Sequence, residues 1–169
     1  MEPRDAYKYC LICGGKLKKS TECVICTQCG YRIYFNPAPA NAVIIENDKG
    51  DILLVRRGVE PQKGFWDLPG GFIKPHETFE ESVRREIREE LGCELKNIKF
   101  ISALPNTYPF QGVNIPTLDI FASAELVTYE LSASDDIDSF QFFSPTEIPF
   151  DEIAFESTKR AIKEYLTRG

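Results

Sequence analysis

The chain has 169 residues, of which 43% are hydrophobic and 27% are charged, and its formal net charge at pH 7 is −6. This composition predicts one globular domain with a small appendage and excludes a disordered chain. No run approaches the roughly 18 apolar residues of a membrane-spanning helix, and the polar first ten residues do not resemble a secretion signal. The acidic charge argues against non-specific binding of nucleic acid.

Two matched cysteine motifs occupy residues 10–30, which read CLICGGKLKKSTECVICTQCG. Each Cys-x-x-Cys pair is followed by glycine, and twelve residues separate the pairs. Zinc takes four thiolates in a tetrahedron, and each short pair turns two sulfurs toward one point. The spacing predicts a zinc ribbon over residues 1–34. Its zinc would be structural, because no coordination position stays open, and its ligands are Cys10, Cys13, Cys26 and Cys29.

Cys23 leaves a second register open, because it also has Cys-x-x-Cys spacing to Cys26. It lacks the repeated glycine, so we interpret it as a spare thiol. Six cysteines without a secretion signal favour the reducing cytoplasm. Residues 1–34 contain six Lys/Arg and three Asp/Glu, which gives them a net charge of +3 and the remainder −9. The lysines between the pairs suggest nucleic acid as a less favoured partner; the favoured interpretation is a solvated loop tip formed by Lys16, Lys18 and Lys19.

The second domain is predicted over residues 35–169, entered through a proline-containing linker at 34–41. Two short apolar runs around a turn predict a β-hairpin at 42–47 and 51–57. The Pro- and Gly-rich stretch 60–72 predicts an ordered loop. Further strands are expected at 98–104, 117–127 and 139–143, and helices at 78–91 and 151–166; the last helix has an apolar stripe of Ile153, Phe155, Ile162 and Leu166. Mixed strands and helices predict an α/β fold with helices packed on the faces of a mixed sheet.

The helix at 78–91 places acidic residues where apolar ones are expected. Thr78 and Glu81 form a capping box, and Gly92 is a typical stop. At about 100° per residue, Glu86 and Glu90 fall on or beside the buried stripe of the helix, and Glu89 lies just outside it. Two stacked carboxylates repel each other, and their burial is costly unless a cation lies between them. Ligands that are all oxygen atoms point to Mg2+ or Mn2+.

The stretch GGFIKPHETFEESVRREIREELGC, which contains this helix, resembles the Nudix box. That box is Gly, five residues, Glu, seven residues, then Arg-Glu-U-x-Glu-Glu-x-Gly-U, where U is a bulky aliphatic residue. One position departs, since Cys93 stands where an aliphatic residue is usual. The matching positions are Gly71, Glu77, Arg85, Glu86, Ile87, Glu89, Glu90 and Gly92.

The resemblance implies an α/β/α sandwich and metal-assisted hydrolysis of a nucleoside diphosphate linked to another moiety. It implies that Glu86 and Glu90 bind metal and that Glu89 either binds metal or holds a water. It adds the backbone carbonyl of Gly71 as a further ligand, and Arg85 and Glu77 as the pair that locks the loop against the helix. We interpret His76, the only histidine, as an exposed loop residue.

A four-cysteine ribbon directly before a Nudix domain is similar to the NADH pyrophosphatase branch. That branch has the signature Ser-Gln-Pro-Trp-Pro-Phe-Pro after the box, where this chain reads ALPNTYP. Pro105, Tyr108 and Pro109 match, and the Ser, Gln and Trp positions do not. Pro109 lies sixteen residues after Cys93, where ADP-ribose pyrophosphatases typically have proline.

These features predict cleavage of a pyrophosphate with AMP on one side, ADP-ribose ahead of NADH and FAD. A base needs flat apolar surfaces, which the predicted loops before and after the box offer. Two alternatives stay open: removal of a nucleotide cap from RNA 5′ ends, and a non-catalytic nucleotide or ADP-ribose sensor, which the intact box disfavours. The sequence leaves a homodimer open. The candidate substrate-binding residues are Phe65, Trp66, Tyr108 and Phe110.

Overall fold

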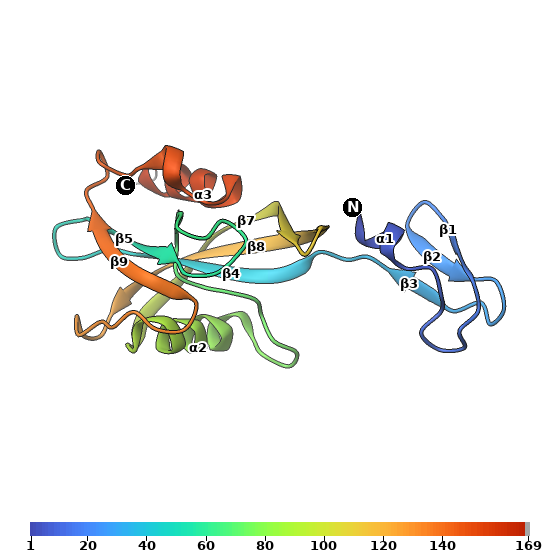
Figure 1. Ribbon diagram of the computed structural model, residues 1–169. Coiled ribbons are helices and arrows are strands. Elements are labelled where there is room, and N and C mark those ends of the chain that lie inside the picture. Colours follow the sequence, from blue (N-terminus) through green and yellow to red (C-terminus); the bar gives the residue numbers. More distant parts are fainter. Residues whose placement is uncertain (168–169) are drawn as a thin grey trace.

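The computed structural model describes residues 1–167. Near the N-terminus, a short helix and three strands form a unit of their own: α1 (Pro3–Ala6), β1 (Leu17–Lys19), β2 (Cys23–Cys26) and β3 (Arg32–Tyr34). The strands pair antiparallel in the order β1-β2-β3. Figure 1 shows this unit at one end of the molecule, apart from the other strands. The predicted ribbon is therefore present as a small three-stranded sheet.

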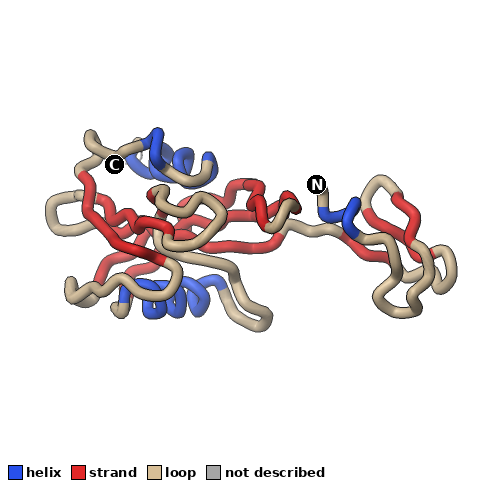
Figure 2. Tube along the Cα trace, viewed as in Figure 1, coloured by secondary structure: helices blue, strands red, loops and turns tan. Residues whose placement is uncertain are grey.

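The remaining strands form two three-stranded sheets. One is mixed, with the order β4-β8-β7, and the other is antiparallel, with the order β6-β5-β9. Helices α2 and α3 lie on opposite sides of the strands (Figures 1 and 2), which confirms the α/β/α sandwich. The elements are β4 (Ala38–Ile45), β5 (Ile52–Arg57), β6 (Trp66–Asp67), α2 (Phe79–Leu91), β7 (Leu95–Phe110), β8 (Val113–Leu126), β9 (Ile137–Phe143), the 3-10 helix η1 (Phe150–Glu152) and α3 (Glu156–Leu166).

Strands β4 and β5 are buried on both faces, which explains their continuous apolar sequences. Successive side chains alternate between faces. Val43 and Leu53 pack in the cluster that contains the buried stripe of α2, whereas Ile44 and Leu54 pack in the cluster that contains Ala161 of α3 and its neighbours. The two clusters hold the helices against the central strands.

The predicted hairpin of residues 42–47 and 51–57 is wrong in its pairing. The turn between them is present, since the Asn47 amide donates to the Asp51 carbonyl at 3.0 Å. However, β4 runs parallel to β8, while β5 pairs with β6 and β9, and only an isolated bridge between Glu46 and Ile52 joins the two runs. The longest pairings, of β4 with β8 and of β5 with β9, join segments far apart in the chain, and local spacing does not reveal such partners.

Strands β7 and β8 are longer than the predicted 98–104 and 117–127 and form one extended hairpin. Tyr108 and Phe110 therefore lie in β7, not in a loop. Pro105 and Pro109 lie within this strand, although proline cannot donate to a ladder. They are tolerated here because β7 is the edge strand of its sheet.

Two other boundaries shift. The predicted linker 34–41 shortens to residues 35–37, because β4 already pairs with β8 from Ala38. The C-terminal helix starts at Glu156 instead of 151. Phe155 is its N-cap, and Ile153 precedes it in a bridge with Trp66. The last two residues of the predicted domain 35–169 lie outside the described residues. Within residues 1–167 no helix is long and apolar enough to cross a bilayer.

Candidate functional site

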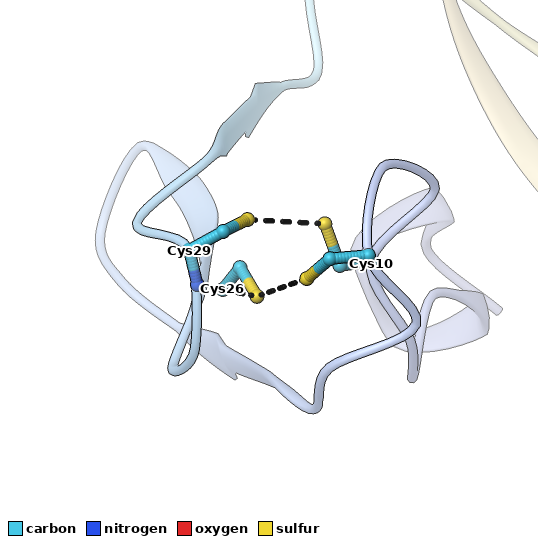
Figure 3. A group of neighbouring side chains, drawn as sticks. Cys10, Cys26 and Cys29 are labelled. Atoms are coloured by element: carbon cyan, nitrogen blue, oxygen red, sulfur yellow. Dashed lines mark hydrogen bonds between the residues drawn. The ribbon is translucent and has the colours of Figure 1, made fainter.

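The ribbon brings the two cysteine pairs together. The sulfur atoms of Cys10, Cys13, Cys26 and Cys29 all lie within 4.8 Å of one another. The Cys10–Cys29 and Cys13–Cys26 sulfur separations are 3.8 and 3.5 Å (Figure 3). A tetrahedral zinc with bonds of about 2.3 Å requires sulfurs about 3.8 Å apart. The four thiols therefore fit a zinc ion as they stand.

Backbone geometry prepares these thiols for a metal. Gly14 and Gly30, which follow the two pairs, have φ of 71° and 75°, a region that glycine enters without strain. Amide groups of Cys29 and Gln28 donate to the Cys26 sulfur, each at 3.4 Å, and lower the pKa of that thiol to about 6. Cys23 lies on β2 outside the cluster.

Helix α2 begins and ends as its sequence predicts. The Thr78 hydroxyl accepts from the Glu81 amide at 3.2 Å, and the Glu81 carboxylate accepts from the Thr78 amide at 2.8 Å. Gly92 ends the helix with φ of 68°. These caps fix which residues face the sheet. Val83, Ile87 and Leu91 are buried, and so is Glu90, which is only 6% exposed.

Arg85 links the helix to the loop before it. Its guanidinium donates to both oxygens of Glu77, at 2.6 and 2.9 Å, and this holds the pKa of Glu77 at about 2. It also donates to Glu86 at 2.6 Å, to Glu89 at 2.9 Å and to the Phe72 carbonyl at 3.1 Å. The predicted lock between Arg85 and Glu77 is formed, and the same guanidinium orients two of the box carboxylates.

Glu90 and Glu86 are carboxylates with raised pKa values because both are largely buried. Burial raises the pKa of Glu90 to about 8, and its carboxylate accepts from the Gly70 amide at 3.1 Å. Burial also raises the pKa of Glu86, whose side chain is 12% exposed. Burial disfavours the charged form of both groups, and at Glu86 the contact with Arg85 opposes this effect only in part. A divalent cation would stabilise the charged forms, so this donor set fits Mg2+ or Mn2+.

Two glycines let the box loop pass between β4 and these carboxylates. A Cβ at Gly71 would lie 2.6 Å from a Glu86 oxygen, and one at Gly70 would lie 2.3 Å from the Asn41 carbonyl. The Gly71 carbonyl, predicted as a metal ligand, accepts from the backbone amide of Asn41 at 2.8 Å and from the side-chain Nδ2 of Asn41 at 3.2 Å. The structure thus turns this oxygen toward β4.

A cavity of about 350 Å³ opens beside the carboxylates. Glu86, Glu89 and Glu90 line one wall. Aromatic rings line another part: Tyr108 stacks on Phe155 at 5.9 Å and meets Phe72 edge-on at 5.4 Å.

The other predicted aromatic residues lie elsewhere. Trp66 packs in the core against Phe143, and Phe65 is exposed outside the lining. Phe110 stacks on Tyr108 from outside the lining. His76 is exposed in the box loop, as the sequence suggested.

Most polar residues of the cavity wall were not predicted from the sequence. Asp67 is buried, which raises its pKa to about 6, and it accepts from the Thr158 hydroxyl at 2.8 Å. Arg57 lies 3.4 Å from Asp67 and stacks over the Phe155 ring. Asp119 accepts from side chains of β8 and α3. A polar residue inside an apolar run, such as Asp67 after Trp66, was the available signal. Its contact with Thr158 of α3 depends on the fold and could not be predicted from the sequence.

The description "NUDIX domain" belongs to the family model that matches residues 36–165. A protein of Methanocaldococcus jannaschii named ADP-ribose pyrophosphatase is 38% identical over 138 residues, which cover 80% of this chain and 77% of that protein. The NAD-capped RNA hydrolase NudC of Haemophilus influenzae is 31% identical over 149 residues, which are 85% of this chain and 55% of NudC. The chain thus spans about half of the NudC relatives. A NUDIX hydrolase structure from Nitrosomonas europaea has a TM-score of 0.75 at 25% identity, covering 96% of this chain and 92% of that one.

The cysteine geometry predicts that Cys29→Ser loses the zinc and that Cys23→Ser keeps one zinc per chain. Of these two residues, Cys29 belongs to the four-cysteine cluster and Cys23 does not. Metal analysis by plasma mass spectrometry on the two purified proteins compares them directly. Zinc retained in Cys29→Ser and lost in Cys23→Ser would show that the ribbon uses the other register.

The Arg85–Glu77 pair predicts a specific pH dependence of stability. The pKa of Glu77 is lowered from 4.5 to about 2, so the unfolded chain takes up this proton first as the pH falls. The contribution of charged Glu77 is complete above about pH 5 and is lost toward pH 2. The melting-temperature gap between wild type and Glu77→Gln should therefore be largest at pH 7 and much smaller at pH 3.

The matched control is Glu80→Gln, since Glu80 pairs with Arg84 at 2.8 Å on the exposed side of the same helix. Exposed pairs contribute little, so its gap should be small at both pH values. A Glu77→Gln gap that stays constant from pH 7 to pH 3 would contradict the account.

Proposed function

The chain belongs to the Nudix family, and from this membership we propose that it is a divalent-metal-dependent pyrophosphohydrolase. Its substrate is a nucleoside diphosphate linked to another moiety, with ADP-ribose ahead of NADH and FAD. The observation that carries the proposal is the convergence of Glu86, Glu89 and Glu90 on one wall of a cavity whose other walls are aromatic and polar.

The carboxylates of α2 are the natural ligands of the catalytic metal. Glu86 and Glu90 lie one helical turn apart and bind Mg2+ or Mn2+, and Glu89 is a third ligand or holds a water. When bound, the metal ions neutralise the pyrophosphate and activate the attacking water. The four ribbon cysteines hold a structural Zn2+, which stabilises a unit too small to build its own core.

The other box residues hold these ligands in place. Arg85 keeps Glu86 and Glu89 oriented and is itself fixed by Glu77. The Gly70 amide donates to Glu90 and opposes its rotation away from the cavity. Lys74 lies 3.7 Å from Glu89 at the cavity and adds positive charge where a phosphate enters. A dianionic pyrophosphate therefore meets cations before it meets carboxylates.

The aromatic part of the cavity suits a nucleotide base. Tyr108 lines the cavity, and Phe110 stacks on it from outside. Arg57, Asn106 and Asp119 supply polar groups for ribose hydroxyls. The name of the archaeal relative, ADP-ribose pyrophosphatase, supports ADP-ribose as the first substrate. Trp66 and Phe65 are not assigned to substrate, given their places in the core and at the surface.

A second candidate is removal of a nucleotide cap from RNA. The relatives named NAD-capped RNA hydrolase favour it, as do exposed Tyr9, Tyr31 and Tyr34 on the basic ribbon, which offer rings for unpaired bases. We place the domain boundary between Tyr34 and Phe35, where β3 ends. We assign the protein to the cytoplasm because thiolate ligands need a reducing compartment.

Glu86→Gln and Glu90→Gln should each lower turnover by about two to four powers of ten, equivalent to roughly 3–5 kcal/mol of activation free energy. Each variant removes a ligand's charge and keeps its shape. The fold should survive, because one of two repelling buried carboxylates becomes neutral. Steady-state kinetics and circular dichroism test both statements. Near-normal turnover in both folded variants would refute the assigned metal ligands.

A substrate panel tests the function itself: ADP-ribose, NADH, NAD+, FAD, diadenosine tetraphosphate, ATP and an NAD-capped RNA oligonucleotide, each with Mg2+ or Mn2+. We expect AMP release to be fastest from ADP-ribose and absent with EDTA. Faster cleavage of the capped RNA than of ADP-ribose would favour the second candidate. Preference for ATP with no cleavage of two-headed substrates would overturn the specificity.

Tyr108→Ala should mainly raise KM for ADP-ribose, with kcat little changed, because stacking holds substrate and transition state alike. Trp66→Phe is a suitable control, since Trp66 is an aromatic residue of the core. An unchanged KM in Tyr108→Ala would remove Tyr108 from the binding site.

A further inference from the structure

Asn41 places an amide where β4 is otherwise apolar. The strand reads APANAVII, and Asn41 is only 3% exposed beneath the box loop, at the cavity wall. A buried amide costs free energy unless it is hydrogen-bonded. The amide therefore requires an explanation in terms of the hydrogen bonds that it makes.

The two donor groups of Asn41 hold three separate segments together. Its backbone amide donates to the Gly71 carbonyl at 2.8 Å, and Nδ2 is 3.2 Å from the same oxygen. Nδ2 also donates to the Ser82 hydroxyl of α2 at 2.9 Å. One side chain thus joins β4, the loop before α2 and the first turns of α2.

The Ser82 hydroxyl links Asn41, through Arg85, to the proposed metal-binding carboxylates. It accepts from Arg85 Nη2 at 3.2 Å. Arg85 in turn donates to Glu86 at 2.6 Å and to Glu89 at 2.9 Å. On the other side of the loop, Gly71 lies against Glu86 so closely that a Cβ would lie 2.6 Å from its oxygen. The loop is therefore held between Asn41 and the Glu86 carboxylate.

The side-chain carbonyl oxygen of Asn41 takes no part in these contacts. Oδ1 is buried and has no hydrogen-bond partner among residues 1–167. A buried unpaired acceptor is destabilising, and few occur in native proteins. An apolar side chain of similar shape would avoid that cost. The residue is thus poorly chosen for stability alone, whereas its two Nδ2 contacts serve the spacing between loop and helix.

We propose that Asn41 is a positioning residue of the metal site. By tying Gly71 and Ser82 to β4, it fixes the gap in which Glu86 and Glu90 receive a divalent cation. The inference rests on the proposed function, because it takes these carboxylates as the metal ligands. Residues that orient metal ligands typically change metal affinity by about 10–100-fold when they are removed.

The test measures Mn2+ binding by electron paramagnetic resonance, without substrate, together with metal-free thermal unfolding. Asn41→Leu keeps the side-chain volume roughly and removes both Nδ2 contacts. We expect its Mn2+ dissociation constant to rise about 10–100-fold. Its metal-free melting temperature should stay near that of wild type, because loss of the unpaired carbonyl offsets the lost hydrogen bonds. Activity lost at low Mn2+ should return at saturating Mn2+.

Ser82→Ala breaks the same connection from the helix side and decides the question if Asn41→Leu does not fold. It should weaken Mn2+ binding in the same direction, and the double variant should bind no more weakly than the weaker single variant. The control is Ser102→Ala on β7, outside the box, which removes another buried oxygen that has no hydrogen-bond partner in the described part of the chain. Its Mn2+ dissociation constant should equal that of wild type.

A Mn2+ dissociation constant within twofold of wild type in both Asn41→Leu and Ser82→Ala would overturn the proposal, whether or not the melting temperature falls. Glu86→Gln separates this failure from failure of the proposed function. If Glu86→Gln binds Mn2+ as wild type does, the metal site itself is wrong. If it binds weakly while Asn41→Leu and Ser82→Ala bind normally, only the role of Asn41 is wrong.

Discussion

Two carboxylates of one helix, Glu86 and Glu90, are held on the buried side of α2, where like charges repel and water is scarce. Much of the surrounding structure accommodates this constraint. The capping box and Gly92 fix the helical phase that sends Glu90 inward with Val83 and Ile87. The loop beside them has glycines where any side chain would collide with Glu86 or β4. Arg85 is the nearby cation that keeps the arrangement intact without metal.

The helix and its ligands were predictable because their determinants are local. Thr78, Glu81 and Gly92 define the ends of the helix within one segment of sequence, and the 3.6-residue period then assigns faces. The four cysteines were predictable for the same reason. Pairing between distant strands was not: β4 joins β8, some 80 residues further on, and nothing in residues 42–57 distinguishes that from a hairpin. Tyr108 was assigned to a loop, but β7 continues through Pro105 and Pro109, which its edge position permits.

The site residues that lie on the strands could not be predicted from the sequence for a related reason. Asp67, Asp119 and Asn41 lie on three strands, and their meaning depends on partners from α3, α2 and the box loop. The Gly71 carbonyl, expected from its position in the box to be a metal ligand, accepts hydrogen bonds from the backbone amide and Nδ2 of Asn41. Its role as a metal ligand stays a prediction. The polar half of the cavity is assembled by the fold, and the acidic half is encoded in one helix.

The most direct measurement is anomalous diffraction at the manganese absorption edge from crystals soaked in Mn2+. The account predicts one or more strong anomalous peaks between the carboxylates of Glu86 and Glu90, distinct from a zinc signal at the four ribbon cysteines. Manganese bound elsewhere, with no peak between those carboxylates, would contradict it.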